Sequence, residues 1–220
     1  MRDPDLRARI RSAAAAVEAA RDDLCRLDAA AGDGDHGVTM AVGARAVLTR
    51  LEAVPTASDP DLVTQAALGM GSIGGAIGPL WASGLLKVAT AMRTGGPVEA
   101  GDEVSRLRAL GEAFEGAIVG LGHAKPGDKT ILDAIGPAVE ALRAAEADGL
   151  PLDAAIDRAV RAADEGARST AGLVATLGRA SRLGERSRGS ADPGATSFAL
   201  IVAALAGVPG DPERPAGSST

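Results

Sequence analysis

The stretch LRARIRSAAAAVEAARDDL, residues 6–24, decides the fold class of this 220-residue chain. Its apolar residues recur at alternating steps of four and three: Leu6, Ile10, Ala13, Val17, Ala20 and Leu24. This spacing predicts one apolar face along a single α-helix. The preceding pair Asp3-Pro4 is typical of a helix start, because it offers a capping carboxylate and then a proline at the first helical position.

The same periodicity continues along the chain, and no segment shows the alternation of a strand. We expect seven further helices, at residues 39–53, 59–68, 80–93, 104–121, 131–147 with an interruption at Gly136-Pro137, 153–176, and from Asp192-Pro193 to 206. Short connections favour antiparallel neighbours. The sequence therefore predicts an all-α, single-domain, eight-helix up-and-down bundle over residues 1–207, with a disordered Pro/Gly/Ser-rich tail at 208–220.

The composition narrows the classes of function. Hydrophobic residues make up 46% of the chain but aromatic residues only 1%, which predicts helices packed closely through small side chains. A net charge of −6 argues against nucleic acid as a partner. Cys25 is the only cysteine, so no disulfide can form within the chain. We find no secretory signal and no membrane-spanning run, and expect a cytoplasmic protein.

The acidic stretch LDAAAGDGDHGVTM, residues 27–40, is the first candidate for chemistry. Asp28, Asp33 and Asp35 fall within eight positions, and nothing basic lies between Arg26 and Arg45. Carboxylates are hard oxygen donors suited to Mg²⁺ or Ca²⁺, and the interleaved glycines let the backbone turn sharply. An EF-hand does not fit, because the required glycine and bidentate glutamate are missing. A solvated polar turn is the alternative to a metal site.

Three further stretches leave alternatives open. The run GMGSIGGAIGP, residues 69–79, follows a helical segment and lacks a downstream acidic residue, so it is not a dinucleotide fingerprint. Its glycines either admit an anion to the backbone or allow close helix packing. Lys129 or Asp128 of PGDKT either contacts phosphate or metal, or belongs to a proline–glycine turn before a helix. The arginines of residues 178–191 either fold over a polyphosphate or are solvated.

Five motifs occur together and in order: GDGDHG, GGxxGPL, PGDKT, GRAS-LGERS and DPGATS. Together they resemble the nucleotide-binding L subunit of dihydroxyacetone kinase, over residues 28–197. The resemblance implies an eight-helix antiparallel barrel whose open end holds the nucleotide. It implies two Mg²⁺ ions on Asp28, Asp33 and Asp35, bridging the phosphates of ADP or ATP. Nucleotide contacts are implied at His36, Gly37, Val38, Thr39, Gly75, Ala76, Ile77, Gly122, Ile131, Arg179, Asp192, Pro193 and Gly194.

The resemblance also implies a reaction. The γ-phosphoryl group would pass to dihydroxyacetone, or a similar short ketose, held on a separate K subunit, and the chain would be inactive without that partner. In one branch of the family, bound ADP is rephosphorylated in place by a phosphotransferase-system M subunit, which makes phosphoenolpyruvate the ultimate donor. We favour this phosphoenolpyruvate-dependent branch for the chain. The alternatives are a kinase subunit with exchangeable ATP and a regulatory ADP-binding module that contacts a transcription factor.

The chain departs from the family pattern at several of these positions. Ile77 stands where serine is usual, so one hydroxyl contact to phosphate is lost or replaced. Leu177, Arg182 and the pair Ser190-Ala191 also differ from the common residues. The three aspartates are intact.

Overall fold

The computed structural model describes residues 5–96, 99 and 101–208. Within that part of the chain nine α-helices and no strand are present. They are α1 (Leu6–Ala19), α2 (Arg21–Ala29), α3 (His36–Glu52), α4 (Asp59–Met70), α5 (Ile77–Thr94), α6 (Glu103–Gly122), α7 (Leu132–Ala147), α8 (Leu152–Ser169) and α9 (Pro193–Ala206). Short 3₁₀ segments lie at Thr170–Gly172 and Arg179–Ser187.

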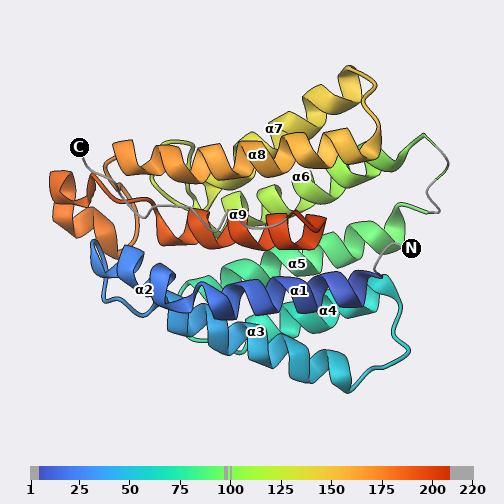
Figure 1. The fold of residues 1–220 in the computed structure, drawn as a ribbon, viewed down its shortest axis with the longest axis horizontal. Helices are drawn as coiled ribbons and strands as arrows, with labels where there is room; N and C mark the ends of the chain where they lie inside the picture. The colour runs from blue at the N-terminus through green and yellow to red at the C-terminus, as the bar shows by residue number, and fades with distance from the viewer. Residues whose placement is uncertain (1–4, 97–98, 100, 209–220) are drawn as a thin grey trace.

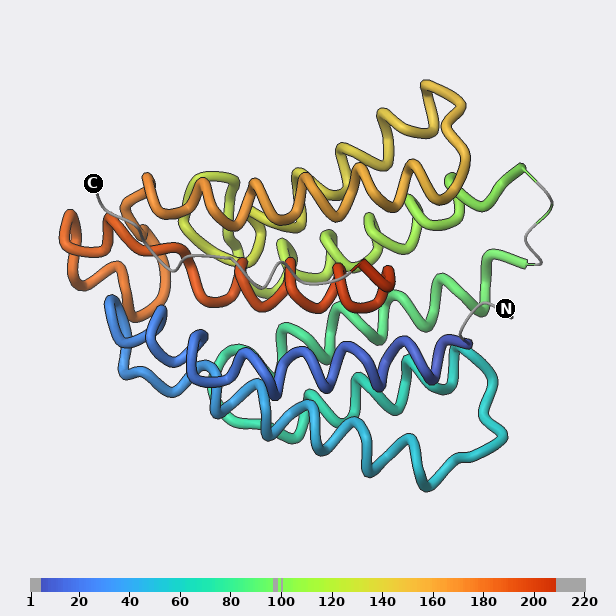
Figure 2. The backbone as a smooth tube through the Cα atoms, viewed as in Figure 1, coloured from blue at the N-terminus to red at the C-terminus, as the bar shows by residue number. Residues whose placement is uncertain are grey.

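The long helices run side by side (Figure 1), and their contacts close into a ring. Each of α3 to α8 packs on the next helix in the chain, α9 packs on α1, and α1 packs on α3. Figure 2 shows the first and last helices adjacent, which closes the ring. The short helix α2 continues α1 at one end of the ring and packs on α3 and α9. The predicted eight-helix antiparallel barrel is therefore confirmed, with α1 and α2 together forming one member.

Three details of the helix prediction were wrong. The apolar face of residues 6–24 does not belong to one helix, because the backbone leaves helical geometry at Ala20. The helix predicted over 153–176 ends at Ser169. Gly136-Pro137 does not interrupt α7. Pro137 cannot donate to the carbonyl of Asp133, and Gly166 of α8 packs against that carbonyl, where a β-carbon would clash.

The described part of the first helix begins at Leu6, where the Asp5 carboxylate accepts a hydrogen bond from the Ala8 amide at 2.8 Å. Asp3-Pro4 and the tail from residue 209 lie outside the described residues. The start of α9 is as predicted, since Asp192 caps it by accepting from the Ala195 amide at 2.7 Å.

The barrel interior is filled by aliphatic side chains, many of them alanine, and by all three aromatic residues of the chain. Trp81, Phe114 and Phe198 come from α5, α6 and α9, with ring centroids 5.4–6.2 Å apart. Gly84 lies against the Phe114 ring, where a side chain would clash. Close approach of the helices through alanine and glycine therefore replaces the bulky core that the composition lacks.

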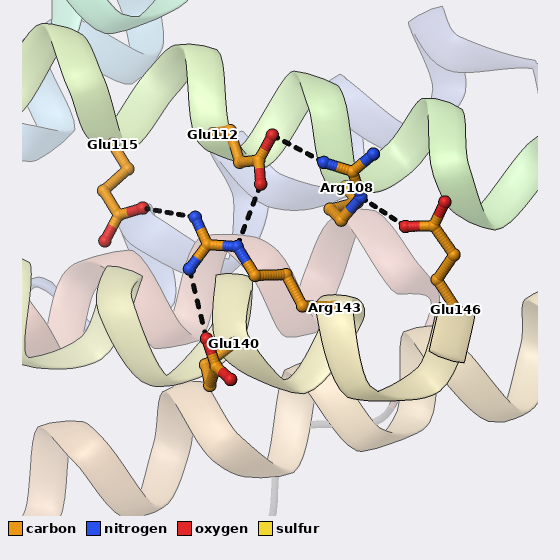
Figure 3. A network of polar contacts seen from close by, with 6 residues as sticks. All are labelled: Arg108, Glu112, Glu115, Glu140, Arg143 and Glu146. Atoms are coloured by element: carbon orange, nitrogen blue, oxygen red, sulfur yellow. Dashed lines mark hydrogen bonds and ion pairs between the residues drawn. The ribbon is translucent and has the colours of Figure 1, made fainter. Parts of the chain in front are cut away.

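An ion-pair network joins the outer faces of α6 and α7 (Figure 3). Arg108 contacts Glu112 and Glu146, and Arg143 contacts Glu112, Glu115 and Glu140. Burial raises the pKa of Glu115 above its usual value. Because the pairs are partly exposed, they add little stability individually. None of the six residues lines the cleft described below.

No helix in the described part of the chain combines the length and the apolar character needed to cross a bilayer.

Candidate functional site

A cleft of about 800 Å³ opens at one end of the barrel. The α2–α3 turn and the start of α9 mark this end, which lies at the left of Figure 1. The loops and helix ends around it come from five parts of the chain: the α2–α3 turn, the α4–α5 turn, the end of α6 with the loop to α7, the α8–α9 segment (residues 170–192), and the start of α9. This volume suits a ligand of nucleotide size.

The up-and-down topology gives this end of the barrel a positive field. Helices α3, α5 and α9 begin here, with their first residues His36, Ile77 and Pro193 lining the cleft. The residue before α7, Ile131, lines it as well. A helix N-terminus carries partial positive charge and amides without helical acceptors. Four such ends converge on one cleft and favour an anionic ligand such as a phosphate.

The acidic loop (residues 28–35) brings the three predicted carboxylates together. One oxygen from each of Asp28, Asp33 and Asp35 lies within 4.8 Å of the others. The buried Asp28 also accepts hydrogen bonds from the amides of Asp35, at 3.0 Å, and His36, at 3.3 Å. Three converging carboxylates are a donor set suited to hard divalent cations, so the residues present fit Mg²⁺.

Glycine makes this convergence possible. A β-carbon at Gly32 would clash with the Asp28 carboxylate, and Gly34 has a φ of 76°, in the left-handed region. At Gly37 a β-carbon would clash with the Arg21 carbonyl of α2. The loop therefore depends on glycine both for its turn and for the close contact of α3 with α2.

Arg179 supplies a cation that the local sequence lacks. It forms ion pairs with Asp33 and Asp35, the latter at 3.3 Å, across more than 140 residues of sequence. The guanidinium reduces the mutual repulsion of the carboxylates. Of the two interpretations of the arginine-rich stretch, this contact favours a role at the site for Arg179. Arg182 and Arg186 are exposed to solvent, which agrees with the alternative interpretation of solvated arginines.

His36 is buried and neutral. Burial lowers its pKa to about 4, although the nearby Asp28 acts in the opposite direction. Its Nε2 lies 3.1 Å from Ser197 Oγ, and that hydroxyl donates to the Gly194 carbonyl at 3.0 Å. The Ser197 oxygen therefore accepts from Nε2–H, which leaves Nδ1 without a proton. This contact ties the start of α3 to α9.

The His36 pKa predicts a pH dependence of stability. Between about pH 4 and 6.5 the unfolded chain binds a proton on this histidine that the folded chain does not. The free energy of unfolding should therefore rise with pH across that window. The expected contribution is up to roughly 3 kcal/mol, as about 1.36 kcal/mol accompanies each pKa unit.

His36→Gln should remove that rise, measured as the difference between the two proteins in urea unfolding at pH 4.5 and 7 with chelator present. Burial also raises the pKa of Asp192, to about 6, which makes stability fall with pH in part of the same window. Because Asp192 is present in both proteins, the difference isolates His36. An unchanged pH profile in the variant contradicts the assignment.

The sixteen predicted site residues divide into those that line the cleft and those that do not. Thirteen of the sixteen line the cleft together: Asp28, Asp35, His36, Thr39, Gly75, Ala76, Ile77, Gly122, Ile131, Arg179, Asp192, Pro193 and Gly194. Asp33, Gly37 and Val38 are not among the lining residues. Asp33 pairs with Arg179, Gly37 packs on α2, and the Val38 side chain is exposed. Gly37 and Val38 still lie in the first turn of α3, where backbone amides lack helical acceptors.

The positions of the glycine run and of PGDKT bear on the alternatives that the sequence leaves open, and Lys129 of PGDKT lies at the cleft. Gly69 and Gly78 pack closely against Val47 and Ile73, whereas Gly74 and Gly75 face open space at the cleft. Asp128 accepts hydrogen bonds from the Lys125 amide and the Thr176 hydroxyl, so it shapes the turn. Lys129 is buried and bound to backbone carbonyls.

Sequence reasoning missed the apolar floor of the cleft and the partner of His36. Leu80, Trp81 and Ile118 line the cleft from α5 and α6. Their spacing is that of any core-facing helix, so no sequence signal separates them from the core. Ser197 lies in the DPGATS motif, but only the fold brings it to His36.

Comparisons with known proteins agree with this geometry. The model of the DAK2 domain family matches residues 30–207. The chain is 37% identical over 194 residues to the phosphoenolpyruvate-dependent dihydroxyacetone kinase 2, ADP-binding subunit DhaL, of Listeria innocua, covering 86% of each chain. It is also 37% identical to L-erythrulose 1-kinase of Mycolicibacterium smegmatis, where the match covers 83% of this chain and 32% of that protein.

A solved structure shows the same fold. The dihydroxyacetone kinase of C. freundii in complex with AMP-PNP and Mg²⁺ superposes with a TM-score of 0.69 at 26% identity, over 93% of this chain and 34% of the other. The family match covers most of the chain, and the Listeria relative matches over nearly its whole length. The chain therefore belongs to the DAK2 domain family and is a relative of the ADP-binding L subunits of dihydroxyacetone kinases.

Proposed function

We propose that this chain is the nucleotide-carrying subunit of a kinase for dihydroxyacetone or a similar short ketose. It binds ADP or ATP with Mg²⁺ in the cleft and presents the γ-phosphoryl group to a substrate held on a separate K subunit. The observation that carries the proposal is the convergence of three carboxylates beside four helix N-termini at the mouth of one cleft. Relatives named as ADP-binding subunits support it.

The arrangement suits phosphoryl transfer, which depends on charge neutralisation and alignment more than on a protein base. Asp28, Asp33 and Asp35 would hold two Mg²⁺ ions, which when bound supply neutralising charge to the phosphate oxygens. The first-turn amides of α3, α5 and α9 add a fixed positive field. Arg179 contributes a cation next to the same loop. The neutral His36 holds α3 against α9 and so fixes the site.

The apolar floor fits a nucleotide base. Leu80, Trp81 and Ile118 offer aliphatic and aromatic surface, while charged lining residues include Asp28 and Asp35 of the acidic loop. A nucleoside diphosphate has this same division between an apolar base and a charged end. Ile77 at the start of α5 has no hydroxyl, so phosphate contacts from this turn are confined to the backbone.

The proposal also concerns the source of the phosphoryl group, which is either bound ADP that is rephosphorylated in place or exchangeable ATP. The Listeria relative, named as the ADP-binding subunit of a phosphoenolpyruvate-dependent kinase, is 37% identical to this chain. The Mycolicibacterium relative, named only as an L-erythrulose 1-kinase, is also 37% identical. We favour the former source, with ADP remaining bound and being rephosphorylated by an M subunit, because the match covers most of the Listeria relative's length. An ATP-dependent subunit with exchangeable nucleotide is the second candidate.

Native mass spectrometry of the purified chain tests both points. We expect ADP and Mg²⁺ to co-purify and to survive dialysis, and the chain alone to phosphorylate no dihydroxyacetone. A protein that binds neither ADP nor ATP with Mg²⁺, or one that turns over dihydroxyacetone without a partner, contradicts the proposal. Nucleotide lost in dialysis but regained from added ATP favours the second candidate.

A further inference from the structure

Lys129 is the one lysine among the buried residues of the described chain, with 4% of its surface exposed. Its Nζ lies 2.6–3.3 Å from four backbone carbonyl oxygens, those of Thr170, Leu173, Ser187 and Ser190. An ammonium group has three hydrogens, so these acceptors use its full capacity. Lys129 also lines the cleft, but its ammonium hydrogens are directed at these carbonyls and away from a ligand. Burial lowers the pKa of the amine.

All four carbonyls belong to the α8–α9 segment. Residues of this segment that line the cleft include Leu177, Gly178, Arg179 and Asp192. The segment has only short 3₁₀ turns of its own, so its shape depends on contacts from elsewhere. Lys129 contacts the α8–α9 segment near both of its ends. The stretch between these contacts includes Arg179, which pairs with the acidic loop.

Two buried hydroxyls complete the same arrangement. Thr170 Oγ1 accepts from the Asp192 amide at 2.7 Å, and Ser187 Oγ accepts from the Ala175 amide at 2.9 Å. Both residues have no exposed surface. The bonds of the Lys129 ammonium are charge-assisted and therefore strong, and the neutral bonds of the two hydroxyls lie where water has no access.

The backbone at Lys129 shows that its position is imposed by the surroundings. Its φ is 61°, in the left-handed region that non-glycine residues seldom adopt. The Asp133 carboxylate holds this turn by accepting from the amides of Gly127, at 2.5 Å, and Thr130, at 2.8 Å. The side chain of Lys129 thus extends from a fixed turn before α7 to the α8–α9 segment.

We propose that Lys129 is a positioning residue that holds the α8–α9 segment so that Arg179 stays within reach of the acidic loop and the bound polyphosphate. Lys129 acts through Arg179 and does not itself contact the ligand. The inference rests on the proposed function for its ligand, but the fixing of the segment can be measured without any nucleotide.

The test compares Lys129→Met with Lys125→Met, a matched change at an exposed lysine of the same loop. Arg179, Arg182, Arg186 and Arg188 are trypsin sites within the segment. We expect cleavage there to be faster by about tenfold or more in Lys129→Met, because loss of the carbonyl contacts lets the segment open locally. Lys125→Met should be cleaved at the wild-type rate, and circular dichroism should show both proteins helical.

The second arm measures affinity for ADP with Mg²⁺ by calorimetry in a double-mutant cycle. Lys129→Met should weaken binding by about tenfold in the wild-type background, and have little further effect in an Arg179→Ala background. A role in general folding would lower affinity by the same factor in both. If Lys129→Met does not fold, Ser187→Ala, which loosens the segment without altering the lysine, should show the same two effects in smaller measure.

Wild-type protection from trypsin in Lys129→Met overturns the proposal. Unchanged affinity overturns it as well, as does an equal loss of affinity in the Arg179→Ala background, or a Ser187→Ala protein that behaves as wild type when Lys129→Met cannot be folded. If the wild-type chain binds no nucleotide, the proposed function fails, and the proteolysis result alone decides whether Lys129 fixes the segment.

Discussion

Replacing Asp35 with alanine is expected to abolish the retention of ADP in the presence of Mg²⁺. Asp35 contributes one of the three converging carboxylates, and its side chain is 56% exposed, so the fold does not depend on it. Removing one of three protein ligands leaves too little negative charge to hold a hydrated cation beside a polyphosphate. We expect at least about a hundredfold loss of affinity by calorimetry, in line with the cost of losing a site ligand.

Asp22→Ala is the matched control. Asp22 lies on α2 and is exposed, and it pairs only with Arg21 outside the cleft. This variant should bind ADP as the wild type does. Both proteins should retain the wild-type helicity and melting temperature within a few degrees, as expected for exposed positions. Retention of ADP by Asp35→Ala at wild-type affinity would show that the acidic loop does not hold the metal.

Replacing Gly37 with alanine is expected to have the largest effect on stability. The added methyl group would clash with the backbone carbonyl of Arg21 and crowd the amide of Cys25, neither of which is the end of a flexible side chain. Relief requires α3 to move away from α2, and overpacking of this kind costs about 1–3 kcal/mol. The free energy of unfolding in urea should fall by about that amount, and the acidic loop should lose its geometry with it.

Gly116→Ala supplies the contrasting result. Gly116 lies within α6 and has open space where a β-carbon would stand. The same substitution there should raise stability by about 0.5–1 kcal/mol, since alanine is the better helix former. If Gly37→Ala is as stable as Gly116→Ala, the close contact between α2 and α3 is not as the structure has it.

The fold was largely predictable because it follows from local pattern. Helical periodicity and the Gly/Pro breaks located most of the helices to within a few residues, although α8 ends earlier than predicted and α2 was not expected as a separate helix. Asp192 was correctly expected to begin the last helix. The break at Ala20 was not predictable, because the apolar spacing of residues 6–24 continues through it and the change of direction is set by packing on α3 and α9. Pro137 wrongly predicted an interruption of α7 for a similar reason. The Asp133 carbonyl that it leaves without a helical donor packs against Gly166 of α8.

The parts of the candidate site whose residues are adjacent in sequence could be predicted. Contacts between residues far apart in sequence could not. Three aspartates interleaved with glycine within one short loop predict a hard-cation site, and the structure brings their carboxylates together. The contacts of Arg179 with that loop, of His36 with Ser197, and of Lys129 with the α8–α9 segment each join residues more than 40 positions apart. No spacing rule reports such contacts, so the roles of Ser197 and Lys129 became visible only in three dimensions.

A crystal structure with Mn²⁺ and ADP tests the central claim most directly. Mn²⁺ shares the oxygen-ligand preference of Mg²⁺ and can be located by its anomalous scattering. The account predicts anomalous peaks at coordination distance, about 2 Å, from the carboxylates of Asp28, Asp33 and Asp35, with the ADP phosphates on the same ions. Peaks elsewhere, or carboxylates still paired with Arg179 and ADP bound without them, would contradict it.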